Sequence, residues 1–169
     1  MLSAFDKKVA QLPDPSRANL AAVNVLVQDA DDVHIQGAAA ALATRRGESG
    51  HDIPYRFDLV VSHLTLHHIP NLPDIIATLY KCLRPGGMIA LTDYEDYGTE
   101  AIRFHPPEKR EGVERHGVKK AEIEEAITGV GFNEVRVERA WVMQKEVGAE
   151  GEKPAEEMEF PFLICLGRR

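Results

Sequence analysis

A strand–helix–strand pattern in the middle of the chain constrains its fold more than any other feature. The pattern begins with the apolar run FDLVV at 57–61 and ends with the apolar run MIALT at 88–92. Between the two runs, Asn71 can cap a helix whose first turn contains Pro73 and Asp74, and all three residue types suit a helix start. Two strands joined by a helix predict a right-handed parallel crossover, and therefore an α/β fold.

Apolar periodicity predicts further elements on both sides of this pattern. The predicted helices cover 2–12, 38–45 and 118–128, and the predicted strands cover 20–27, 132–143 and 160–166. The short spacing between the last two strands predicts an antiparallel hairpin at the sheet edge. We expect Pro85-Gly86-Gly87 to end the central helix, and the polar stretch 95–117 to form a lid or substrate loop.

Composition excludes several classes of protein. The chain has 169 residues, which suits one domain, and its net charge of −7 argues against a general nucleic-acid binder. No segment has the continuous apolar length of a signal peptide or a membrane span. The two cysteines, Cys82 and Cys165, stand in apolar runs and are interpreted as buried hydrophobic residues. We therefore expect a cytoplasmic protein that contacts neither nucleic acid nor membrane.

The central pattern also resembles a known family. The run FDLVVSHLTLHHI, the capped helix and LRPGGMIALTDY resemble the fourth strand, the following helix and the fifth strand of class I S-adenosylmethionine (SAM)-dependent methyltransferases. The small-molecule, quinone-biosynthesis-like branch is the most similar. HGVKKAEIEEAITGVGF and the two strands after it resemble the last helix and the reversed final strand pair of that family. The resemblance extends over nearly all of 1–169.

The resemblance implies a Rossmann-like, mostly parallel sheet of strand order 3-2-1-4-5-7-6 with a C-terminal antiparallel hairpin. It also implies methyl transfer from SAM to a small-molecule acceptor, with the cofactor lying across the carboxyl ends of the strands. By position, Asp29 and Ala30 would meet the adenine of SAM. Ser62 and His63 would lie beside its methionine part.

The same resemblance places the methyl acceptor beside a second group of residues. Asp93 and Tyr94 would end the fifth strand and face the acceptor, and His105 in the predicted lid is a further substrate-binding candidate. His67 or His68 can serve as a general base, because imidazole titrates near neutral pH. The alternative is that both histidines are packed or solvated residues of a loop.

A metal site is a separate interpretation of the histidines. On a helix, His63 and His67 would share one face, as in zinc-binding helices. No Glu follows His63, and Pro70 limits any helix in this segment. We therefore expect no metal site, and a metal-dependent hydrolase remains only as a third functional hypothesis.

The chain departs from the family pattern at its start. The family begins with a strand, a glycine-rich cofactor loop and a second strand, whereas this chain has no glycine before Gly37. Met1-Leu2 resembles the start of the family segment that follows the second strand. We therefore expect a partial, N-terminally truncated domain over 1–169 that lacks the first two strands and binds SAM weakly. The alternative is a non-catalytic scaffold protein that uses the remaining sheet as an interface, for example as a homodimer through exposed strand edges.

Overall fold

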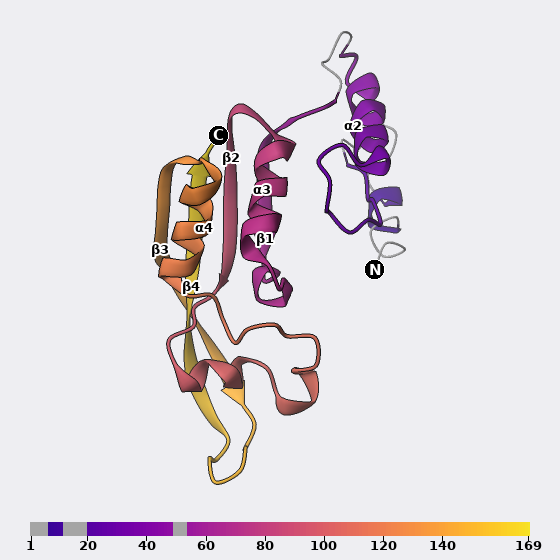
Figure 1. The fold of residues 1–169 in the computed structure, drawn as a ribbon. Coiled ribbons are helices and arrows are strands. Elements are labelled where there is room, and N and C mark those ends of the chain that lie inside the picture. The colour runs from indigo at the N-terminus through magenta and orange to yellow at the C-terminus, as the bar shows by residue number, and fades with distance from the viewer. Residues whose placement is uncertain (1–6, 12–19, 49–53) are drawn as a thin grey trace. The chain divides into compact units, whose positions relative to one another are not determined.

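The computed structural model describes residues 7–11, 20–48 and 54–169 and divides the chain into two compact units, Met1–Arg56 and Phe57–Arg169 (Figure 1). The helices are α2 (Val33–Arg45), α3 (Leu72–Cys82) and α4 (Lys120–Val130). The strands are β1 (Phe57–His63), β2 (Leu83–Tyr94), β3 (Asn133–Val147) and β4 (Glu156–Arg168). Three short 3-10 helices, η2 (Leu66–His68), η3 (Thr99–Phe104) and η4 (Pro107–Lys109), connect these elements.

In the N-terminal unit, α2 begins before the predicted helix 38–45. The Asp32 carboxylate accepts hydrogen bonds from the backbone N–H groups of His34 and Ile35, so a side-chain cap fixes the helix start at Val33. Residues 7–10 are helical and Gln11 lies in a turn, whereas residues 2–6 and 12 of the predicted helix lie outside the described residues.

The predicted strand over 20–27 is wrong. These residues have no regular secondary structure, and Leu26 is 76% exposed. Alternating valines suit a pleated strand, but a strand also needs a neighbour that accepts and donates its backbone hydrogen bonds. Residues 20–27 pair with no strand in the described part of the chain.

The C-terminal unit contains a four-stranded sheet of order β1-β2-β4-β3. β1 and β2 are parallel, whereas β4 is antiparallel to both β2 and β3. When β1 and β2 are taken as the fourth and fifth family strands, this order is the 4-5-7-6 end of the expected sheet. The α/β fold and the C-terminal antiparallel hairpin are therefore confirmed. The parallel part is smaller than predicted, because 20–27 contributes no strand.

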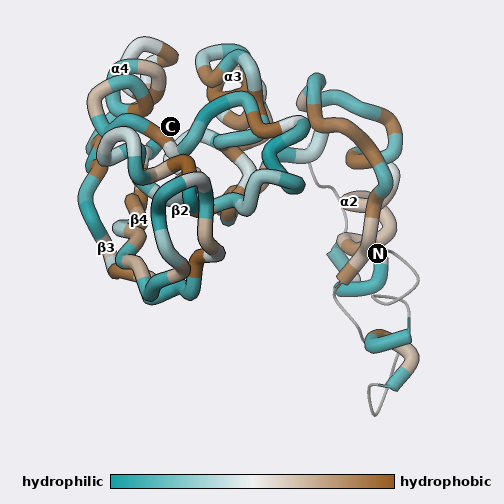
Figure 2. The backbone as a smooth tube through the Cα atoms, turned by 90° about the horizontal axis from the view of Figure 1, so that it is seen from below, coloured by the Kyte–Doolittle hydropathy of each residue, from teal (hydrophilic) through white to brown (hydrophobic). Residues whose placement is uncertain are grey.

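One face of this sheet is covered by helices. α3 and α4 pack beside each other against the strands (Figure 1), and the hydropathy colours alternate along α3 as expected for a helix with one apolar face (Figure 2). The buried core between helices and sheet includes Ile76, Leu79, Ile89, Leu91, Ile123 and Ile127. Each such side chain contributes about 1.5–3 kcal/mol when it is removed from water.

The opposite face of β1 is open in this unit. Leu59 and Val61 are 54% and 68% exposed, although the apolar run 57–61 is typical of a strand covered on both faces. Within the C-terminal unit, the described residues therefore cover only one face of this strand. No described helix has the length and apolar character that a membrane crossing requires.

The end of α3 also differs from the prediction. The helix ends at Cys82, Leu83 is already extended, and Gly86 and Gly87 lie within β2. A Cβ atom on Gly87 would lie 2.9 Å from the Phe57 carbonyl oxygen, and the β1–β2 register shifts at this point. The Pro-Gly-Gly run therefore allows a close approach of two strands instead of ending the helix.

Candidate functional site

A strained turn brings the chain from β1 to the candidate site. Leu64 has a φ of +52°, a backbone conformation that is uncommon for a bulky residue. Its N–H donates to the Thr92 carbonyl at 2.9 Å, and the Thr65 hydroxyl donates to the His63 carbonyl at 3.1 Å. Because β1 and β2 are parallel, this turn places η2 beside the carboxyl end of β2, where ligands bind in open α/β sheets.

A buried histidine–aspartate pair forms the centre of the site. His67 and Asp93 are each 1% exposed, and His67 Nδ1 lies 2.8 Å from Asp93 Oδ1. The carboxylate also accepts the backbone N–H groups of His67 at 3.1 Å and Tyr94 at 2.8 Å. Because a carboxylate only accepts, Nδ1 carries a proton, and in the neutral imidazole Nε2 keeps its lone pair. His67 Nε2 is buried without a hydrogen-bond partner among the described residues.

Two further histidines surround His67. The ring centroids of His68 and His105 lie 4.1 and 5.0 Å from that of His67, and one ring nitrogen of each histidine lies within 4.8 Å of the others. His68 Nδ1 lies 2.9 Å from the Gly112 carbonyl oxygen. Burial, and then the neighbouring His67 and Lys145, lower the pKa of His105 to about 4. The site therefore collects three imidazoles, which can accept protons or bind a metal ion.

Tyr94 closes the site on the core side. Its ring is fully buried and stacks on Phe104 at a centroid distance of 4.1 Å, and its hydroxyl lies 3.4 Å from His105 Nδ1. Burial and the charge of Asp93 raise the pKa of Tyr94. The hydroxyl therefore stays protonated at neutral pH and can donate a hydrogen bond.

The stretch 95–117, predicted as a lid or substrate loop, is anchored over η2. The backbone N–H groups of Glu114 and Arg115 donate to the His67 carbonyl at 3.0 and 3.2 Å. The Arg115 guanidinium donates to the carbonyls of Leu66 and Pro70. These bonds fix the backbone around His67, so the position of its ring depends on this stretch.

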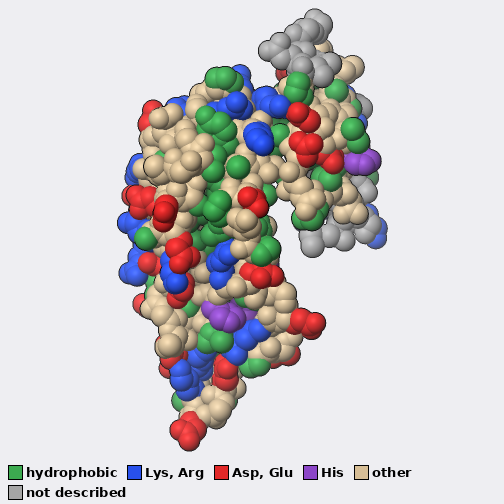
Figure 3. Space-filling model, in the orientation of Figure 1, with side chains coloured by type: hydrophobic (Ala, Val, Ile, Leu, Met, Phe, Trp, Pro, Cys, Tyr) green, Lys and Arg blue, Asp and Glu red, His purple; other side chains and the backbone are tan. Residues whose placement is uncertain are grey.

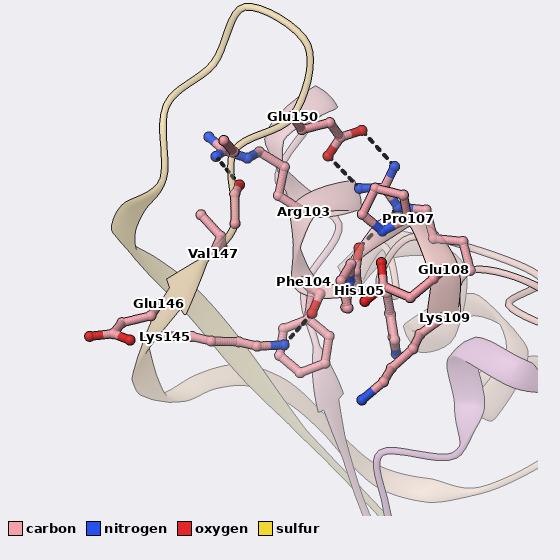
Figure 4. A pocket seen from close by; sticks show the side chains of 14 residues that line it. Arg103, Phe104, His105, Pro107, Glu108, Lys109, Lys145, Glu146, Val147 and Glu150 are labelled. Atoms are coloured by element: carbon pink, nitrogen blue, oxygen red, sulfur yellow. Dashed lines mark hydrogen bonds and ion pairs between the residues drawn. The ribbon is translucent and has the colours of Figure 1, made fainter.

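A charged pocket lies next to the histidines and is lined on one side by His105 (Figure 4). Its volume of about 490 Å³ is in the range of small-molecule sites. Several of its charged groups, however, already have partners. Arg110 forms two 2.6 Å bonds with Glu150, and Lys145 donates to the Phe104 carbonyl. Histidine side chains reach the surface of this unit among Lys and Arg side chains (Figure 3).

The structure brings five of the predicted site residues together: His67, His68, Asp93, Tyr94 and His105. It directs the Asp93 carboxylate toward His67, whereas the sequence suggested that it faces the acceptor. Asp93 therefore acts on the site through His67.

The four predicted cofactor residues lie in two places. Ser62 and His63 end β1, where His63 Nδ1 lies 2.7 Å from Thr92 Oγ1 and its ring stacks on Phe162. Asp29 and Ala30 precede α2 in the N-terminal unit, and the Asp29 carboxylate accepts the Asp31 N–H at 3.0 Å.

Sequence reasoning missed the structural role of three residues: Leu64, Phe104 and Arg115. Leu64 sets the direction of η2, Phe104 supports Tyr94, and Arg115 fixes η2 through its carbonyls. No local pattern identifies these roles, because each depends on a contact between segments far apart in the sequence.

Comparisons with known proteins identify a family that this chain matches. A protein family described as "Methyltransferase domain" matches residues 3–137. "Phosphoethanolamine N-methyltransferase 2" of Caenorhabditis elegans is 29% identical over 114 residues, which cover 67% of this chain and 26% of that protein. "Phosphoethanolamine N-methyltransferase 1" of Triticum aestivum is 31% identical over 98 residues, 54% of this chain and 19% of that protein. The chain thus spans about a quarter or less of the length of these curated relatives.

A solved structure supports the fold. The YcgJ protein of Bacillus subtilis aligns with a TM-score of 0.52 at 11% identity, over 82% of this chain and 80% of that chain. At this level of identity the similarity concerns the fold alone.

Proposed function

The chain belongs to the family of SAM-dependent methyltransferase domains, and on this basis we propose that it transfers a methyl group from SAM to the nitrogen of a small phosphorylated amine. Two similar proteins are phosphoethanolamine N-methyltransferases by name, which supports an acceptor of the phosphoethanolamine type. The observation that carries the proposal is the ring nitrogen His67 Nε2, which is buried without a partner among the described residues at the carboxyl ends of β1 and β2.

An amine acceptor needs a proton acceptor, because a protonated nitrogen has no lone pair with which to attack a methyl group. Asp93 holds the Nδ1–H of His67, and His67 Nε2 then accepts the proton that the amine loses. His68 is the second candidate base, since its Nδ1 is held by a backbone carbonyl in the same manner. Tyr94 stays protonated and can hold the acceptor by hydrogen bonding.

SAM, when bound, supplies a methyl group already activated on its sulfonium. The side-chain chemistry of Asp29, Ser62 and His63 fits this cofactor, because a carboxylate accepts from an amino group and a hydroxyl or imidazole can bind a carboxylate. We propose that Asp29 and Ala30 bind the adenine end, and that Ser62 and His63 bind the methionine end. The reaction itself then depends mainly on alignment of the acceptor with the methyl group.

We further propose that the 169-residue chain by itself binds SAM weakly. It has no glycine before Gly37, so within these residues no glycine-rich loop precedes 20–27 to let the backbone approach the cofactor closely. Loss of three or four polar contacts of about 1 kcal/mol each weakens binding roughly 100- to 1,000-fold. Calorimetric titration with SAM and with S-adenosylhomocysteine tests this proposal, and low-micromolar affinity would contradict it.

The function is tested by incubating the chain with saturating SAM and with one of three acceptors: phosphoethanolamine, ethanolamine or a quinol. Mass spectrometry should detect methylated phosphoethanolamine and little methylated ethanolamine. A methylated quinol would instead favour the quinone-biosynthesis-like branch. If SAM binding is measurable and no acceptor is methylated, the proposed function is wrong.

The open face of β1 supports a second candidate function, a non-catalytic interface. Leu59 and Val61 expose apolar surface on a strand that has a single described neighbour, β2, and such surfaces often pair with another chain. If this face forms a homodimer, Val61→Lys should convert the dimer to a monomer in analytical ultracentrifugation. A wild-type monomer at high concentration would exclude the homodimer.

A further inference from the structure

Three imidazoles from two separate segments converge at the candidate site. His67 and His68 belong to η2, and His105 directly follows η3. One ring nitrogen of each lies within 4.8 Å of the other two. From this geometry we propose that His67, His68 and His105 bind one divalent transition-metal ion, with Zn²⁺ as the best-matched ion.

The surroundings of His67 support a metal ligand more specifically than proximity does. Metal-binding histidines usually donate their second ring N–H to a carboxylate or a backbone carbonyl, which fixes the tautomer and directs the other nitrogen at the ion. His67 Nδ1 lies 2.8 Å from the Asp93 carboxylate, and its Nε2 is buried without a described partner. A buried polar atom left in this state costs about 1–3 kcal/mol, and coordination of a metal ion would remove that cost.

His68 shows the same arrangement with a backbone partner. Its Nδ1 lies 2.9 Å from the Gly112 carbonyl oxygen, which leaves Nε2 available. Two of the three proposed ligands are thus held at one nitrogen and available at the other. Tetrahedral coordination at bond lengths of about 2.0–2.1 Å requires nitrogens roughly 3.4 Å apart, so the rings must move closer. The exposed ring of His68 has the space for this movement.

The type of donor decides which ions fit. Neutral imidazoles bind Zn²⁺, Cu²⁺ and Ni²⁺, whereas Mg²⁺ and Ca²⁺ prefer oxygen ligands. The negative charge of Asp93 partly balances the ion. Three protein ligands also leave a fourth position open to water or another small molecule.

Metal binding and the proposed proton transfer use the same atom, His67 Nε2. A bound ion would remove that lone pair from the acceptor, and the metal-loaded chain should then transfer methyl groups more slowly. Metal binding does not depend on the proposed methyl transfer, because it requires neither SAM nor acceptor.

The sequence identified His67, His68 and His105 as candidate site residues, but it did not indicate that they form one metal site. Sequence spacing pointed to His63 and His67, but His63 instead contacts Thr92 and Phe162. The third ligand, His105, comes from a stretch whose path is set by contacts with η2 and β2.

The proposal is tested on the full chain after metal removal with a chelator, in the absence of SAM. Titration with Zn²⁺ followed by calorimetry should show one ion per chain, and Co²⁺ should give the visible absorption bands of a tetrahedral site. His68→Gln and His105→Gln should each weaken Zn²⁺ binding at least tenfold. Asp93→Asn should weaken it about 10- to 100-fold, as loss of an outer partner does in other metal sites.

His34→Gln is the matched control, because His34 is an exposed histidine of the N-terminal unit. This variant should bind Zn²⁺ like the wild type. Circular dichroism must show that each variant is folded, and His68→Gln keeps the test decisive because its exposed ring contributes little to the core. The proposal is wrong if Zn²⁺ binding does not saturate, if His68→Gln and His105→Gln bind like the wild type, or if His34→Gln weakens binding equally.

Discussion

His105 belongs both to the histidine cluster (His67, His68 and His105) and to the lining of the neighbouring charged pocket. The two regions differ in whether their polar groups have partners. In the pocket, the guanidinium of Arg110 and the carboxylate of Glu150 are paired, and the Lys145 ammonium donates to the Phe104 carbonyl. In the cluster, a buried acceptor, His67 Nε2, has no partner among the described residues.

This comparison distinguishes charged groups whose bonds stabilise the fold from polar atoms that remain available for chemistry. Arg103 illustrates the first case, because it is 4% exposed and its guanidinium binds Glu156 and two backbone carbonyls. Arg103 Nε is also buried without a described partner, but a guanidinium N–H can only donate, whereas the second nitrogen of a neutral imidazole can accept a proton or bind a metal ion. The charged pocket is therefore a weaker candidate for chemistry than the histidine cluster beside it.

The largest expected effect comes from Gly117, which connects the anchored stretch to the core beside the cluster. Gly117 has a φ of +99°, and an added Cβ would lie 2.6 Å from the Asp96 backbone nitrogen. Gly117→Ala should destabilise the protein by roughly 2–4 kcal/mol, measured by chemical denaturation.

Gly112 provides the matched control for this substitution, since its φ is +79° and an added Cβ would meet no atom within 4 Å. Gly112→Ala should cost only about 1–2 kcal/mol, the cost of a left-handed backbone for alanine. Equal losses for the two variants would show that the close approach at Gly117 contributes nothing.

The second prediction sharpens the comparison directly, with one carboxylate-to-amide substitution in each region. Asp93→Asn removes the charged acceptor of His67 Nδ1 and should cost about 1–3 kcal/mol, together with roughly 100-fold or more of any methyl-transfer rate. Glu150→Gln breaks a partly exposed ion pair, whose contribution is usually small, and should change neither quantity measurably. If the two variants behave alike in denaturation and in the assay, the distinction between the regions is wrong.

The third prediction concerns folding stability at acidic pH, and its expected effect is the smallest. The pKa of His105 is lowered from 6.5 to about 4, so between these pH values the unfolded chain binds a proton that the folded chain does not. Stability should therefore fall as the pH falls through this window. His105→Gln should reduce that fall in denaturation curves at pH 7 and pH 5 with a chelator present, whereas His34→Gln should leave it unchanged. The same pH dependence in all three proteins would contradict the environment assigned to His105.

Much of the fold could be predicted because its signals are local. Asn71 accepts the Asp74 N–H at 3.3 Å as the cap of α3, and Gly131, a residue type that favours the αL conformation, ends α4. The prediction of a strand over 20–27 was wrong because a strand needs a neighbouring strand to pair with. The alternation of valines carries no information about whether that neighbour is present.

The candidate site was predictable in part, for the same reason. His67, His68 and Asp93 follow two strands predicted to be parallel, so their proximity could be expected from topology. The bond between His67 and Asp93 could not, because it depends on the positive φ of Leu64, a conformation that propensity disfavours for leucine. The approach of His105 depends on tertiary contacts of the stretch 95–117.

The central claim is that Asp93 holds His67 in the tautomer that leaves Nε2 available. Long-range ¹H–¹⁵N correlation NMR of the imidazole rings, recorded at about pH 8.5, above the usual titration range of histidine, measures this directly in the metal-free chain. The account predicts a protonated Nδ1 and a lone-pair Nε2 for His67, and loss of this preference in Asp93→Asn. A lone pair on Nδ1 and a proton on Nε2 in the wild type would contradict it.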